Sequence, residues 1–131
     1  MKVMALDFGS ARTGVAVSDP TGLIARPLCV VQRAASDDGL SQLERLVMDE
    51  DVETVVVGHP LTLRGDRGEQ ARASERFAQT LRERLEVPVV LFDERFTTDL
   101  AQQTPSAAAE DARAAAHLLS SYLAWSSAAP A

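Results

Sequence analysis

Short apolar runs separated by turn residues dominate the first quarter of the chain. Residues 2–8 form a mostly apolar run, which is typical of a buried strand. Residues 13–19 alternate between apolar and polar positions, and the turn residues 19–22 follow. A third extended run covers residues 26–32. These neighbouring runs with short connections predict an antiparallel meander of three strands.

The apolar period changes to a helical one after the meander. Ser36 is a helix-capping residue in front of a stripe formed by Leu40, Leu43, Leu46 and Val47. Residues 53–57 form a continuous run whose last four residues are β-branched, as expected of a central parallel strand. A Gly-, Pro- and Arg-rich loop covers residues 58–68. The pattern therefore predicts a helix followed by a parallel strand.

The rest of the chain predicts two more helices around one more strand. Apolar residues at four-residue spacing define the next helix: Ala73, Phe77, Leu81 and Leu85. Residues 89–92 form another buried strand. Thr97 or Thr98 begins a short helical segment that Pro105 ends, and the last helix runs to about Trp125. The tail from Ser126 is expected to be frayed.

The element order β-β-β-α-β-α-β-α predicts an α/β fold. We expect a mixed five-stranded sheet, an antiparallel meander plus parallel strands, with helices on its faces. The chain has 131 residues, enough for a single domain over 1–131. Ligands of such sheets gather beyond the carboxyl ends of the parallel strands. Candidate chemistry is therefore expected at that edge.

Composition and charge narrow the classes of function. Apolar residues make up 46% of the chain and charged residues 24%, which is typical of a globular protein. The net charge of −6 argues against electrostatic binding of nucleic acid over the whole surface. It is compatible with a local basic groove or a metal-bridged contact. No apolar stretch has the ~18 residues of a membrane span. The single cysteine, Cys29, excludes an internal disulfide and favours a cytoplasmic location.

Three acidic residues occupy positions that are unusual for acids. Asp7 and Glu94 follow buried strands, and Asp111 lies on the apolar stripe of the last helix. Each has a structural alternative. Asp7 could accept hydrogen bonds from the turn at Gly9, and Glu94 could pair with Arg95. Asp111 could be favoured by the helix dipole in the first turn of its helix. Their predicted convergence favours a cation among them. Oxygen ligands of this kind suit Mg²⁺ or Mn²⁺, and two such ions would activate water and stabilise the leaving oxygen of a phosphodiester.

Residues 7–14 have the spacing D-x-G-x-x-x-x-G. Gly9 and Gly14 permit a tight turn and a close approach of phosphate to the backbone, and Arg12 lies between them. Actin-like and sugar-kinase ATPases use a similar turn. A Walker A loop is excluded because Val15 stands where its lysine would be. The turn is therefore a candidate for binding a phosphate.

Arginine supplies nearly all of the positive charge. Its planar fork suits phosphate, and Arg64 and Arg67 lie in the loop 58–68 near the predicted site. The alternative is a solvated face of mixed charge, which we prefer for Arg82 and Arg84. His59 follows a parallel strand and is expected to point toward the active edge, where it either orients substrate or has a structural role.

Four blocks of the sequence carry a family resemblance. They are L-D-F-G with Arg12 and G-V-A-V-S-D (residues 6–19), V-V-G-H-P-L (56–61), D-E-R-F-T-T (93–98) and D-A-R-A-A (111–115). In order and spacing, the chain resembles the YqgF/RuvX family of RNase H-like proteins, described as Holliday junction resolvases or pre-16S rRNA nucleases. The resemblance implies an RNase H-like fold and divalent-metal phosphodiester hydrolysis. The family's catalytic acids fall on Asp7, Glu94 and Asp111.

The resemblance and the residue patterns together define a predicted substrate-binding set. Its members are Gly9, Arg12, Gly14, His59, Arg64, Arg67, Arg95 and Thr97. His59 departs from the family, which usually has leucine there. The stretch from Thr98 to Asp111 is also shorter than usual and lacks a basic cluster. This difference favours RNA over a four-way DNA junction as the substrate.

The leading hypothesis is a cytoplasmic nuclease that uses two Mg²⁺ or Mn²⁺ ions and matures the 5′ end of precursor 16S rRNA. Holliday junction resolution is the first alternative, and it would need a homodimer that presents two sites. The second is a catalytically silent nucleic-acid-binding factor in ribosome assembly. A nucleotide-binding module of the actin-like kind is disfavoured, because the chain is too short for two lobes.

Overall fold

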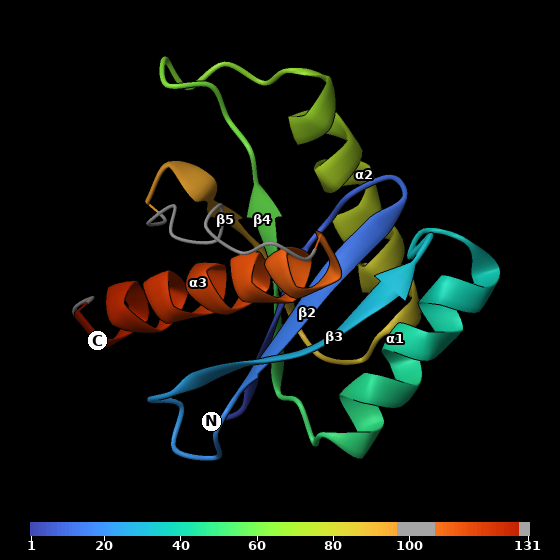
Figure 1. Ribbon diagram of the computed structural model, residues 1–131, viewed down its shortest axis with the longest axis vertical. Helices are drawn as coiled ribbons and strands as arrows, with labels where there is room; N and C mark the ends of the chain where they lie inside the picture. The colour runs from blue at the N-terminus through green and yellow to red at the C-terminus, as the bar shows by residue number, and fades with distance from the viewer. Residues whose placement is uncertain (97–106, 129–131) are drawn as a thin grey trace.

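A single five-stranded sheet forms the centre of the molecule. The computed structural model describes residues 1–96 and 107–128. The strand order is β3-β2-β1-β4-β5 (Figure 1). β1 pairs antiparallel with β2 and parallel with β4, β2 pairs antiparallel with β3, and β4 pairs parallel with β5. The predicted meander and parallel strands are therefore confirmed. The strands are β1 (Val3–Asp7), β2 (Arg12–Ser18), β3 (Ala25–Gln32), β4 (Thr54–His59) and β5 (Val89–Asp93).

In the described part of the chain, three helices cover the sheet, and a short 3₁₀ turn, η1 (Glu94–Phe96), follows β5. α1 (Asp37–Asp49) is capped as predicted, because the Ser36 hydroxyl accepts a hydrogen bond from the Gly39 amide at 3.1 Å. α2 spans Glu69–Arg84 and α3 spans Ala107–Ala128. α3 continues three residues past the predicted end, since serine and alanine do not interrupt a helix. The segment predicted to begin at Thr97 or Thr98 lies outside the described residues.

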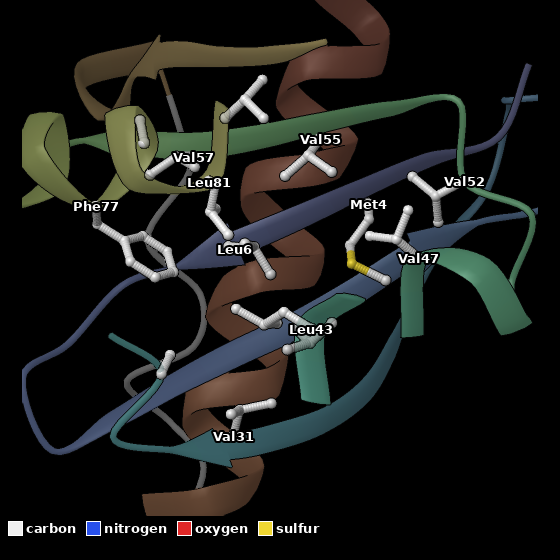
Figure 2. Packing of buried hydrophobic residues seen from close by; sticks show 14 of the residues in the cluster. Met4, Leu6, Val31, Leu43, Val47, Val52, Val55, Val57, Phe77 and Leu81 are labelled. Carbon is white, nitrogen blue, oxygen red and sulfur yellow. The ribbon is translucent and has the colours of Figure 1, made fainter. Parts of the chain in front are cut away.

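The two faces of the sheet carry separate apolar clusters. One cluster lies between the sheet and the pair α1 and α2, where Leu43 and Leu81 point at Met4 and Leu6 (Figure 2). The other cluster lies between the sheet and α3, which crosses the opposite face (Figure 1). Alternate residues of each strand supply the two clusters, as the pleat requires. Among the described helices, none is long and apolar enough to cross a membrane.

Candidate active site

Asp7 lies where β1 ends, on the face that α3 covers. Val3 and Ala5 belong to the apolar cluster beneath α3, and the strand period of two puts Asp7 on the same face. The side chain is partly buried. Burial, with a further contribution from the charge of Asp111, raises the pKa of Asp7 to about 6. Burying the charged form of Asp7 therefore costs free energy, and a cation bound nearby would reduce that cost.

Glu94 directly follows β5, which pairs with β4, and its side chain lies against β4. Gly58 of β4 leaves room for it, because a Cβ on this glycine would come within 2.9 Å of the Glu94 Cδ. Burial is the main reason that the pKa of Glu94 is raised to about 7, and the charges of Asp7 and Asp93 add to it. The two carboxylates thus act on each other across the carboxyl ends of β1 and β5.

Asp111 approaches the same place from α3. Its backbone carbonyl packs on Gly14 of β2 so closely that a Cβ there would lie 1.8 Å from the carbonyl oxygen. Oδ2 of Asp111 lies 2.9 Å from Nε of Arg12, but this N–H does not point at it. Oδ2 is buried without a hydrogen-bond partner among the described residues. Such an oxygen is a candidate ligand for a cation.

The chemistry of the three acids fits a divalent cation. Their donors are all carboxylate oxygens, the class that Mg²⁺ and Mn²⁺ prefer. Burial, and to a smaller extent repulsion by the charges of Asp111 on Asp7 and of Asp7 on Glu94, raises the pKa values of Asp7 and Glu94. Among residues 1–96 and 107–128, however, no three His, Cys, Asp or Glu side chains stand close enough to hold one ion. The acids converge on one sheet edge without forming a closed three-ligand site.

Gly9 and Arg12 form the turn between β1 and β2. A Cβ on Gly9 would come within 2.5 Å of the Arg12 carbonyl oxygen, so the turn requires glycine at this position. The Arg12 side chain is partly exposed, and its guanidinium lies beside Asp111. The predicted turn therefore exists, and it brings a cationic side chain beside Asp111.

His59 lies on the other face of the sheet. The pleat turns it away from Gly58, and its Nε2 lies 2.6 Å from a carboxylate oxygen of Glu75 on α2. Arg67 donates to the same carboxylate from Nε at 2.8 Å. Together they lower the pKa of Glu75 to about 2, with Arg67 the larger cause. Two residues predicted to contact substrate are thus joined to α2 through one glutamate.

Arg95 and Arg64 differ in how they are engaged. Arg95 binds the Asp93 carboxylate, with Nε 2.9 Å from Oδ2, and its NH1 lies 3.5 Å from the Leu63 carbonyl oxygen. Arg64 is exposed in the loop between β4 and α2. Thr97, the remaining member of the predicted set, lies outside the described residues. Arg64 is therefore available to a ligand, whereas Arg95 already has a structural role.

Three residues that the sequence alone does not single out also shape this edge. Gly58 makes space for Glu94, and Glu75 and Asp93 are the partners of His59, Arg67 and Arg95. Gly58 carried a signal, since a glycine on the face of Val56 interrupts an otherwise β-branched run. Glu75 carried none, because its pairing depends on how α2 packs against the sheet.

A family model described as "RuvX: Holliday junction resolvase" matches residues 1–125. The chain belongs to the RuvX family. Among curated relatives, RuvX proteins named "Putative pre-16S rRNA nuclease" are similar to this chain. The one from Chloroflexus aurantiacus is 46% identical over 101 residues, which cover 77% of this chain and 66% of that protein. The one from Geobacillus kaustophilus is 41% identical over 134 residues, covering 94% of this chain and 97% of that protein.

Solved structures share the fold of this RuvX protein. Thermus thermophilus RuvC, in complex with a Holliday junction substrate, superposes with a TM-score of 0.63 at 16% identity and covers 98% of this chain and 96% of its own. The fowlpox virus Holliday junction resolvase has a TM-score of 0.54 at 11% identity, covering 95% and 99%. These likenesses confirm the predicted RNase H-like fold.

Proposed function

We propose that this RuvX protein is a divalent-metal-dependent nuclease whose site is formed by Asp7, Glu94 and Asp111. The observation that carries the proposal is the convergence of three acids on one sheet edge, from the end of β1, from η1 directly after β5, and from α3. Burial and mutual repulsion raise the pKa values of Asp7 and Glu94, which is unfavourable for the folded protein alone. A bound cation would offset that repulsion.

The proposed roles of the residues follow from their positions. Asp7 and Glu94 would hold the metal ions from the two strand ends, and Asp111 would offer Oδ2, which accepts no hydrogen bond from the described residues. Mg²⁺ or Mn²⁺ bound there would supply an activated water and stabilise the leaving oxygen of a phosphodiester. Near neutral pH, Glu94 carries a proton part of the time and would release it on binding a cation.

Arg12 would position the nucleic-acid backbone beside the carboxylates. Its guanidinium lies at the edge of the site, partly exposed, where a phosphate can approach it. Gly9 permits the tight turn beside it, whereas the Asp111 backbone covers Gly14, so the predicted contact of Gly14 with substrate is not supported. Arg12 binds and orients the substrate in the proposal, whereas the acids carry the chemistry.

We propose that the substrate is a precursor of 16S rRNA, processed at its 5′ end in the cytoplasm. The support is the name carried by relatives that are 41–46% identical to this chain. Holliday junction resolution is the second candidate, favoured by the description of the family model. It would require a dimer, because two strands are cut.

Cleavage assays with matched substrates test the proposal. Precursor 16S rRNA, single-stranded RNA, single-stranded DNA and a four-way junction would each be incubated with Mn²⁺, Mg²⁺ or EDTA. We expect RNA cleavage that needs both metal and Asp7, and Asp7→Asn should reduce the rate by about 10³-fold, since a metal ligand contributes several kcal/mol. Asp49→Asn, an exposed acid at the end of α1, is the matched control.

The outcomes separate the candidates. Selective cleavage of the junction would favour resolvase activity. RNA binding that is unchanged in Asp7→Asn, without cleavage by the wild type, would identify a silent binding factor. Cleavage by Asp7→Asn at the wild-type rate would overturn the assignment of the site.

A further inference from the structure

The loop between β4 and α2 has a tip that is closed by its own hydrogen bonds. The Thr62 amide donates to the Asp66 carbonyl at 3.0 Å, and the Gly65 amide donates to the Thr62 carbonyl at 2.8 Å. The Asp66 amide also donates to the Thr62 hydroxyl at 3.0 Å. Gly65 has a φ of 87°, a conformation that favours glycine. Residues 62–66, here named the tip turn, therefore form a defined structure that projects beyond the sheet (Figure 1).

The tip turn presents an apolar and a cationic side chain to solvent. Leu63 is 92% exposed, more than the other exposed large hydrophobic residues of the described chain. Arg64 beside it is exposed and, within residues 1–96 and 107–128, has no ion-pair partner. Single exposed leucines are common on protein surfaces. This one differs because an uncommitted cation adjoins it on an ordered turn.

Two arginines fix the tip turn beside the proposed active site. The Arg95 guanidinium, held by Asp93, reaches the Leu63 carbonyl, and a Cβ on Gly65 would lie 3.3 Å from its NH1. Asp93 directly precedes Glu94. At the other end of the loop, Arg67 holds Glu75 on α2. The turn is thus connected to the sheet edge where the three acids converge.

We propose that the tip turn binds an unpaired nucleotide, with Leu63 packing on the base, Arg64 contacting the adjacent phosphate and Arg95 acting as the positioning residue. An exposed strand offers an apolar base face and an anionic phosphate side by side, which matches this pair of side chains. In a duplex the base faces are stacked and unavailable to Leu63. The proposal rests on the nuclease function above and deepens it, because it makes the preferred substrate single-stranded near the cut.

Binding measurements test the proposal without depending on cleavage. Every variant is placed in the Asp7→Asn background with Mg²⁺ present, and binding of a labelled single-stranded RNA and a matched RNA duplex is followed at several salt concentrations. Leu63→Ser, Arg64→Ala and Arg95→Lys are the test variants. Leu23→Ser is the matched control for Leu63, since Leu23 is 74% exposed in the β2–β3 turn. Arg45→Ala, an exposed arginine on α1, matches the loss of charge.

The three variants have different expected signatures. Leu63→Ser should weaken single-strand binding about fivefold, with duplex affinity and salt dependence unchanged, because a base contact carries no charge. Arg64→Ala should weaken binding to both RNAs and lower the salt slope by about one unit, as expected for one lost phosphate contact. Arg95→Lys keeps the charge but cannot span Asp93 and the turn, so it should reproduce the Leu63→Ser result.

Several results would overturn the proposal. One such result is that Leu63→Ser changes RNA affinity no more than Leu23→Ser does. Another is that it weakens single-strand and duplex binding equally. It could change the oligomeric state in sedimentation without changing RNA affinity, which would make Leu63 a protein contact. The proposal would also be contradicted if the Asp7→Asn protein with an unchanged tip turn bound no RNA. RNA cleavage by the Asp7→Asn protein would instead count against the nuclease site, so the two failures are distinguishable.

Discussion

The two faces of the sheet are made by the same strands but differ at the carboxyl edge. On the face of α1 and α2, large apolar residues such as Leu6, Val57 and Phe77 continue the packing toward the strand ends. On the face of α3, the corresponding positions hold Gly14 and Gly58. The first face gains stability from burial, whereas the glycines of the second let the Asp111 backbone and the Glu94 side chain lie close against the strand ends. A strand can therefore serve the core and the candidate active site at once.

Gly14→Ala should have the largest effect on stability, because it breaks the contact that seats α3. Its Cβ would meet a rigid backbone carbonyl at 1.8 Å, so neither side can move cheaply. We expect the free energy of unfolding to fall by about 4 kcal/mol, at the upper end for overpacking. Chemical denaturation measures it. Gly68→Ala is the control, since a Cβ there meets nothing within 4 Å, and an equal loss in both variants would contradict the prediction.

Leu81→Ala should weaken the packing on the face of α1 and α2 without changing the site of the three acids. Leu81 is fully buried between α2 and the sheet. Removing it should lower the free energy of unfolding by about 3 kcal/mol through lost burial and the cavity left behind. Mn²⁺ affinity of the folded protein, measured by calorimetry, should not change. A marked loss of Mn²⁺ affinity would show that the two faces are not independent.

Asp7→Asn should stabilise the metal-free protein at neutral pH. The folded pKa of about 6 lies above the ordinary aspartate pKa of 3.8, so the unfolded state ionises first and wild-type stability falls as pH rises from about 4 to 6. Asparagine does not ionise, so the Asp7→Asn protein should not lose stability in this way as the pH rises. We expect a gain of about 3 kcal/mol at pH 7, as that shift implies, which disappears below pH 4. Denaturation at both pH values checks it, and a gain that persists at pH 3.5 would contradict this cause.

Gly58→Ala should sharpen the comparison by disturbing the site with little effect on the core. The Cβ would meet the Glu94 side chain, at 2.9 Å from Cδ, and this side chain is able to shift. We expect Mn²⁺ affinity to fall about tenfold, as when the support of a metal ligand is changed. The free energy of unfolding should fall by less than about 1 kcal/mol, because no rigid backbone is displaced. Unchanged Mn²⁺ binding would remove Glu94 from the proposed ligand set.

Local sequence signals were sufficient for most of the fold. The β-branched run of β4 and the cap at Ser36 depend on neighbours within a few residues, and both were predicted correctly. The position of Asp7 at a strand end also follows from local pattern. His59 is the informative exception. It was expected to face the active edge, but its partner Glu75 lies 16 residues away on a helix whose packing no local signal describes.

The sequence by itself determined the elements, their order and the strand ends that carry Asp7 and Glu94, because apolar period, caps and turn residues act over short distances. Tertiary structure alone decided which side chains meet. The close contact of Asp111 with Gly14 and the pairing of His59 with Glu75 arise when α3 and α2 dock on the sheet, and the space that Gly58 leaves for Glu94 is filled when β5 pairs with β4. Docking depends on contacts between residues far apart in the chain, and a single sequence does not display them.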